Sequence, residues 1–122
     1  MSGQIVNLKL EAERLSGRSH SLLAIARRLA QYAGDDRTVA RQVEAVIASA
    51  ERLSSAAARL VARPDNLKAE AERLSDSGRD LLEIARQLTP TAAENPSAAS
   101  EVDDLVRIAE ATSASSARLV GL

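Results

Sequence analysis

The stretch that decides the fold is NLKLEAERLS, residues 7–16, because it returns almost unchanged as NLKAEAERLS, residues 66–75. The offset of 59 residues holds without a gap, so that Ala58-Arg59-Leu60-Val61 returns as residues 117–120. About two-fifths of the aligned positions are identical. A repeat of this length is one supersecondary unit used twice. The sequence therefore predicts a single domain, residues 1–122, that contains two copies of one unit.

Apolar and small residues recur along each copy at alternating spacings of four and three. This spacing is typical of one face of a helix in a bundle and differs from the alternation of a strand. In the first copy the positions are Leu8, Ala12, Leu15, Ser19, Leu22, Ala26, Leu29 and Ala33, followed by Val39, Val43, Val46, Ala50, Leu53, Ala57 and Leu60. The second copy repeats the pattern from Leu67 to Leu119, which predicts four amphipathic helices.

Turn-forming residues separate these four segments. They are Gly34-Asp35-Asp36, Arg63-Pro64-Asp65-Asn66, Pro90 and Asn95-Pro96. An Asp can cap the second helix, and Asn95-Pro96 is typical of an N-cap followed by a first-turn proline. We therefore predict helices over residues 4–33, 37–62, 66–89 and 97–120.

The three connections between the predicted helices are short, so neighbouring helices are expected to run antiparallel. The predicted fold is all-α: an antiparallel up-down-up-down four-helix bundle built from two tandem helical hairpins, residues 4–62 and 66–120. The strict seven-residue period predicts a left-handed supercoil.

The composition limits the classes of protein to which the chain can belong. The sequence has no Cys, Trp or Phe, and Tyr32 is its one aromatic residue, so the core must be aliphatic. A disulfide framework and a thiolate metal site are excluded. No apolar run approaches the roughly 18 residues of a membrane span, and no signal-peptide pattern is present. We expect a cytoplasmic protein without a membrane partner.

The net charge of −1 hides a difference between the two halves of the chain. Residues 1–63 carry ten Lys and Arg against six Asp and Glu, and residues 64–122 carry six against eleven. This asymmetry indicates either attraction between two docked hairpins or head-to-tail association between molecules. Basic residues do not alternate with aromatic ones, so nucleic acid is not an expected partner.

The residues that could carry out catalysis are few. His20 is the single histidine, and it has three interpretations: a surface residue, a metal or haem ligand, or a phosphoacceptor. A nucleophilic serine needs an adjacent base and an orienting acid, and His20 is predicted on an outer flank. We therefore expect a protein without enzymatic activity, catalytic residues, metal or cofactor.

Small residues meet at one level of the predicted bundle. Antiparallel pairing brings together Ser19, Ala50, Gly78 and Ala109, with Thr112 and Ser116 close by. Such a layer indicates either very close helices or a cavity that accepts an apolar small molecule. A glycine inside a helix costs about 1 kcal/mol relative to alanine, which indicates a purpose for Gly78. A ligand-binding bundle is therefore an alternative function.

The segment LSGRSHSLLAI, residues 15–25, resembles the first helix of histidine-kinase dimerisation hairpins. In that family two hairpins pair into a four-helix bundle, and the phosphorylated histidine precedes an arginine. This chain has Gly17 before its arginine, and the second copy has Asp76 at the equivalent position. The resemblance therefore implies a shared hairpin architecture, and the phosphorylation chemistry does not carry over.

The whole chain resembles de novo designed four-helix bundles in its regular heptads, its short connections and its Met1-Ser2-Gly3 start. That resemblance implies a scaffold or a helix-mediated interaction module, with self-association or a protein partner. In contrast, two Lys beside fourteen Arg and unevenly diverged copies favour a natural signalling or adaptor hairpin pair. Since the candidate chemical groups sit where the copies differ, we interpret the repeat as a repeat of packing.

Overall fold

The computed structural model describes residues 2–62 and 66–121, with side chains from residue 7 onward. These residues form five α-helices and, within the described ranges, no strand. The helices are α1 (Ser2–Ala30), α2 (Arg37–Ala62), α3 (Leu67–Gln87), α4 (Thr89–Glu94) and α5 (Pro96–Gly121). The predicted all-α class is therefore confirmed. Most of the predicted connection between the hairpins, residues 63–65, lies outside the described residues.

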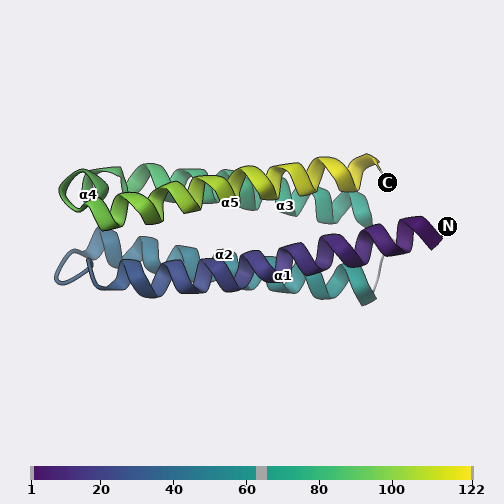
Figure 1. Cartoon of the computed structure of the whole chain (residues 1–122), viewed down its shortest axis with the longest axis horizontal. Helices are drawn as coiled ribbons and strands as arrows, with labels where there is room; N and C mark the ends of the chain where they lie inside the picture. The colour runs from purple at the N-terminus through teal and green to yellow at the C-terminus, as the bar shows by residue number, and fades with distance from the viewer. Residues whose placement is uncertain (1, 63–65, 122) are drawn as a thin grey trace.

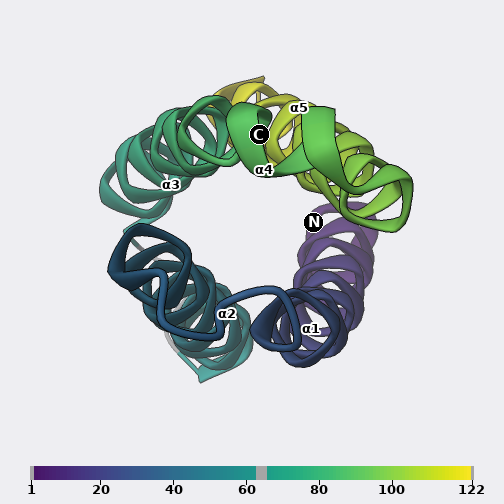
Figure 2. The ribbon, with the colours of Figure 1, turned by 90° about the vertical axis from the view of Figure 1, so that its left-hand side faces the viewer.

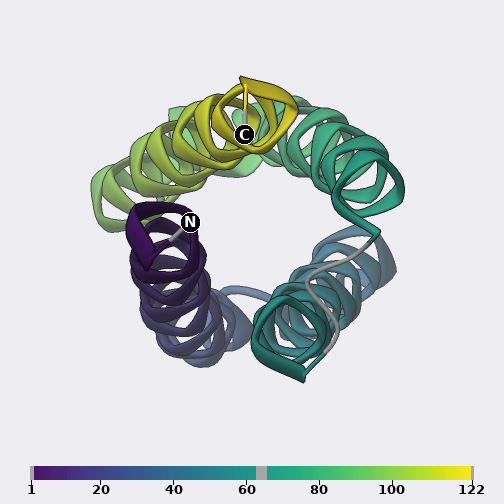
Figure 3. The ribbon, with the colours of Figure 1, turned by 90° about the vertical axis from the view of Figure 1, so that its right-hand side faces the viewer.

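The long helices α1, α2, α3 and α5 lie lengthwise beside one another (Figure 1). Viewed from either end, they surround a common interior (Figures 2 and 3). The most extensive contacts join α1 to α2 and α3 to α5, and smaller ones join α2 to α3 and α1 to α5. We call α1 and α2 the first hairpin, and α3 to α5 the second. The two hairpins therefore meet at two interfaces, α1–α5 and α2–α3.

The first connection shows why α1 ends before the predicted residue 33. The backbone amide of Tyr32 donates to the carbonyl of Leu29, and that of Ala33 to the carbonyl of Ala30. These bonds span three residues and tighten the chain out of the α-helix. Gly34 then adopts a positive φ of 46°, which glycine tolerates without a side-chain clash.

The predicted aspartate cap of the second helix is confirmed at Asp36. Its carboxylate accepts hydrogen bonds from the backbone amides of Thr38 at 2.9 Å and Val39 at 3.3 Å. These amides belong to the first turn of α2, where no carbonyl within the helix can reach them. Asp36 therefore fixes the start of α2.

The third connection corrects the predicted helix ends. The third predicted helix stops at Gln87, before residue 89, and a short helix, α4, occupies part of the predicted loop. Pro90 lies in the first turn of α4, where a missing amide proton costs nothing. Pro96 begins α5, as predicted to within one residue, after Asn95 in an extended conformation. None of the residues of α4 is buried.

The interior follows the predicted heptad pattern. Leu15, Leu22, Leu53, Leu81 and Leu105 are 0% exposed, and the small residues between such leucines are buried as well. A close-packed aliphatic core of this kind supplies the main driving force for folding. Buried polar residues that the pattern did not predict are Glu11, Ser49, Glu70, Ser77, Glu101 and Ser115.

Candidate functional site

The predicted mid-level layer is divided between two helix contacts. In the first hairpin the hydroxyl of Ser19 donates to the carbonyl of Ala50 at 2.7 Å. In the second hairpin the equivalent residues are Gly78 and Ala109. A β-carbon built on Gly78 would lie 3.2 Å from the Ala109 carbonyl oxygen, so these backbones approach closely. The geometry favours close helices at this level.

The other two residues of the predicted layer are also engaged with backbone. Thr112 donates to the carbonyl of Ile108 on its own helix at 2.7 Å. Ser116 donates to the carbonyl of Ala71 across the α3–α5 contact at 2.6 Å. Their hydroxyls are therefore satisfied without a ligand. The apolar-ligand pocket stays a prediction.

His20 lies on an exposed face of α1. Its Nδ1 is 2.9 Å from the carbonyl oxygen of Ser16, one turn earlier in the helix. Across the described ranges, 2–62 and 66–121, no group of three or more His, Cys, Asp or Glu side chains is placed to hold a metal ion. None of the described helices is long and apolar enough to cross a membrane.

The two interfaces between the hairpins carry equivalent charged clusters. At the α1–α5 interface Arg118 donates to both carboxylate oxygens of Glu11 at 2.9 Å, and Arg14 donates to it at 3.1 Å. Glu11 is 3% exposed. Although burial alone raises the pKa of Glu11, the hydrogen bonds from both arginines outweigh it and bring the pKa below the ordinary value.

The same cluster recurs 59 residues later at the α2–α3 interface. Arg59 donates to both oxygens of Glu70 at 2.5 and 3.0 Å, and Arg73 donates at 2.9 Å. Glu70 is 2% exposed. The hydrogen bonds to the two glutamates raise the pKa of Arg59 and of Arg118. The duplication therefore repeats a cluster of ion pairs that joins the hairpins. The interpretation of the repeat as a repeat of packing alone is incomplete.

Three further polar contacts are specific to one interface. Arg28 pairs with the largely buried Glu101 across α1–α5 at 2.6 Å, and Arg52 pairs with Asp80 across α2–α3 at 3.0 Å. Arg18 donates to the buried hydroxyl of Ser115 across α1–α5 at 2.7 Å. Each pair falls where the copies differ, so these contacts distinguish the two interfaces.

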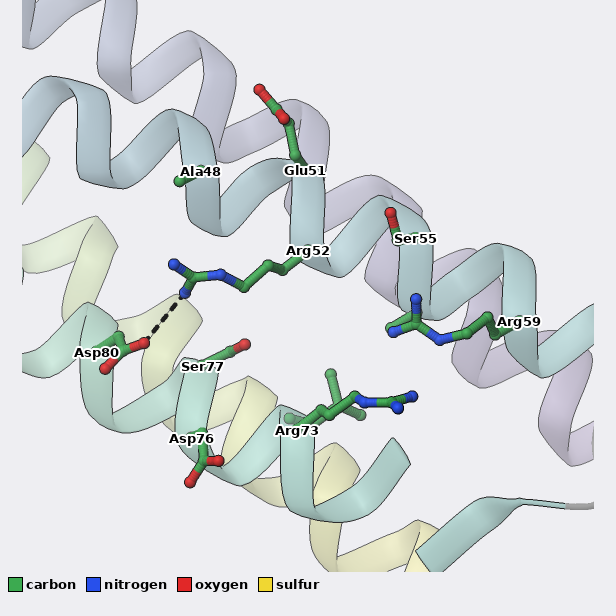
Figure 4. Close-up of a pocket in the computed structure, with 11 residues that line it drawn as sticks. Ala48, Glu51, Arg52, Ser55, Arg59, Arg73, Asp76, Ser77 and Asp80 are labelled. Atoms are coloured by element: carbon green, nitrogen blue, oxygen red, sulfur yellow. Dashed lines mark hydrogen bonds and ion pairs between the residues drawn. The ribbon is translucent and has the colours of Figure 1, made fainter. Parts of the chain in front are cut away.

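A groove opens along the α2–α3 interface, with a volume of about 580 Å³. Arg52 and Arg59 reach over it from α2, while Arg73, Ser77 and Asp80 line it from α3 (Figure 4). The remaining lining residues are Ala48, Glu51, Ser55, Ala56, Leu74 and Asp76. The groove combines charges of both signs with two hydroxyls, which suits a polar ligand.

Two smaller grooves lie within the hairpins and are equivalent to each other. We call them the outer grooves. One lies between α1 and α2 and is lined by Lys9, Ala12, Glu13, Ser16, Ser54, Ala57, Ala58 and Val61. The other lies between α3 and α5 and is lined by Leu67, Lys68, Ala71, Glu72, Ser75, Ser116, Leu119 and Val120. Sequence reasoning missed these surfaces, although the repeated Lys, Glu and Val were the signal for them.

Comparison with known proteins adds no relative from which a role could be transferred. No family model, no curated protein and no solved structure matches the chain.

Proposed function

We propose that this chain is a non-enzymatic helical scaffold and helix-mediated interaction module whose partner is a second copy of the chain. Its framework is an antiparallel up-down-up-down four-helix bundle of two hairpins with a left-handed supercoil. The short connections and the seven-residue period support this topology. The outer grooves are its contact surfaces.

The equivalence of the outer grooves carries this proposal. Val61 is 65% exposed and its equivalent, Val120, is 71% exposed. Identical core residues are expected in two copies that share a packing scheme. Packing places no such demand on exposed side chains. The second copy nevertheless repeats the valine, and it repeats Lys9 as Lys68 and Glu13 as Glu72. A shared contact accounts for their retention, because an exposed apolar residue gains stability when a partner covers it.

The charges of each outer groove make it complementary to itself. Lys9 and Glu13 are both exposed and lie one helical turn apart on α1. When two copies of this face meet about a twofold axis, Lys9 of each molecule lies opposite Glu13 of the other. Ala57 and Ala58 on α2 are small, so they leave room for a helix to approach the groove. Since Lys68 and Glu72 repeat the arrangement, each molecule has two such faces.

Sedimentation equilibrium over a wide range of protein concentration tests the proposal. The average mass of the native chain should rise with concentration, and the double variant V61D/V120D should remain monomeric. The matched control is Leu10→Asp, because Leu10 is 42% exposed and is not repeated in the second copy. This control should associate like the native chain. A native chain that stays monomeric throughout, or a double variant that associates equally well, would overturn the proposal.

A further inference from the structure

One of the contacts that distinguish the two interfaces between the hairpins is the buried pair of Arg18 and Ser115. At α1–α5 the guanidinium of Arg18 lies in the interface and donates to the hydroxyl of Ser115, a residue that is 0% exposed. Burial lowers the pKa of Arg18, with the positive charges of Arg118 and Arg14 acting in the same direction and Glu11 opposing them. The equivalents of Arg18 and Ser115 at α2–α3 are Ser77 and Ala56. The α2–α3 interface therefore lacks this guanidinium.

The α2–α3 groove lies where that guanidinium is missing. Ser77 and Ala56 both line it, and Figure 4 shows the Ser77 side chain between Asp80 and Arg73. Ser77 is 4% exposed, and its side chain lines the groove from α3. A ligand that enters the groove can therefore reach the Ser77 hydroxyl, which can accept a hydrogen bond.

The charge of the groove also differs from that of its counterpart. Relative to the α1–α5 interface, the groove loses two cations, because Arg18 and Arg107 become Ser77 and Ala48. It gains two acids, Asp76 and Asp80, which replace Gly17 and Ser21. One cation is gained, since Arg52 replaces Ala111. Three arginines and three acids line the groove, so it carries no net charge, whereas the equivalent surface at α1–α5 is three charges more positive and repels a cation.

We infer that the α2–α3 groove binds a guanidinium group supplied from outside the chain. The first copy supplies this group itself, through Arg18, at the interface where Glu11 already binds two arginines. The second copy repeats the glutamate and its two arginines as Glu70, Arg59 and Arg73, and leaves the third position open. A guanidinium there donates to the Ser77 hydroxyl and to the carboxylate of Asp80.

The present partner of Asp80 does not block this binding. Arg52 and Asp80 are 53% and 58% exposed, so their ion pair contributes little and exchanges readily. Asp76 is held by Arg79 at a longer distance of 3.7 Å, with both side chains more than 70% exposed. The planar guanidinium can bond to a carboxylate and a hydroxyl together, whereas an ammonium is a point charge. The site lies apart from the outer grooves and does not depend on self-association.

Two-dimensional amide NMR of the full chain, at constant ionic strength, tests the site with methylguanidinium and methylammonium as probes. Methylguanidinium should shift the resonances around Ser77 and Ala56 at several-fold lower concentration than methylammonium does. N-acetyl-arginine amide and a helical peptide with one arginine distinguish the source of the group. Tighter binding of the peptide assigns a protein partner, and equal binding assigns a small molecule. Absence of saturable shifts with every probe would overturn the inference.

Two variants make the test specific. S77R/A56S copies the Arg18–Ser115 contact into the second interface, so it should fill the groove and abolish binding of methylguanidinium. D76N/D80N leaves the volume unchanged and should weaken binding about two- to fivefold for each carboxylate that contributes. The matched control is E83Q, which removes an exposed acid of α3 outside the groove and should leave binding unchanged. Undiminished binding in folded S77R/A56S, or in D76N/D80N, would contradict the site.

Discussion

Gly78 shows how one residue sets the distance between two helices. A β-carbon at this position would lie 2.7 Å from the Ser113 hydroxyl and 3.2 Å from the carbonyl oxygen of Ala109. The first contact is with a side chain that can move, and the second is with backbone that cannot do so cheaply. At Gly17, also inside a helix, a β-carbon would meet nothing within 4 Å. The two glycines therefore have different roles.

Replacing each glycine with alanine separates these roles. Gly17→Ala should stabilise the protein by about 0.5–1 kcal/mol, because alanine loses less backbone freedom in a helix. Gly78→Ala has the same propensity gain but must displace Ser113 and crowd Ala109, so its gain should be smaller or reversed. Urea unfolding followed by circular dichroism measures both values. Equal gains at the two positions would contradict the close approach of α3 and α5.

At the scale of helices, the buried glutamates join the two hairpins. Glu11 on α1 binds Arg118 on α5, and Glu70 on α3 binds Arg59 on α2. A buried carboxylate is stable as an ion when hydrogen bonds replace the water that it lost. Each glutamate accepts hydrogen bonds from one arginine across the interface and from one arginine on its own helix. These bonds replace the lost hydration.

The lowered pKa of Glu11 predicts a stability that depends on pH. Because this pKa is lower in the folded state than in the unfolded state, the stabilisation is fully present above the unfolded value, about 4.3. It is lost as the pH falls through the lower, folded pKa. Glu11→Gln should cost roughly 1–3 kcal/mol at pH 7, since it removes charged hydrogen bonds. It should also flatten the fall in stability below about pH 4.

Urea unfolding at pH 7 and pH 3 measures both effects of Glu11→Gln. The control is Asp80→Asn, which changes an exposed ion pair and should alter stability by no more than about 0.5 kcal/mol. If the stability of Glu11→Gln at pH 7 equals that of the native chain, the cluster does not hold the hairpins together.

The sequence predicted the helices well and the clusters poorly, for physical reasons. Heptad spacing depends on local periodicity, so it identified Leu15, Leu53 and Leu105 as core residues, and all three are buried. Glu11 lies beside this apolar face, where local spacing cannot distinguish a solvated flank from an interface with a distant helix. α4 was missed because a proline predicts an interruption but does not exclude a short helix, and Pro90 lies within the first turn of this one.

At the scale of the molecule, the opposite charges of the two halves appear as contacts between the hairpins. Arg28, Arg52 and Arg59 of the first hairpin pair with acids of the second. The pair between Arg118 and Glu11 runs in the opposite direction. The predicted attraction between docked hairpins is thus present in the structure. Head-to-tail pairing between molecules through the same asymmetry stays a prediction.

The most direct test of the proposed repeated surface is sedimentation equilibrium of the single variants V61D and V120D. The native chain presents two equivalent faces, so its association is open-ended and should pass beyond the dimer as the concentration rises. Each single variant keeps one face, and its average mass should level off at that of a dimer. Growth of either single variant past the dimer, or a native chain that also stops at the dimer, would contradict two equivalent docking faces.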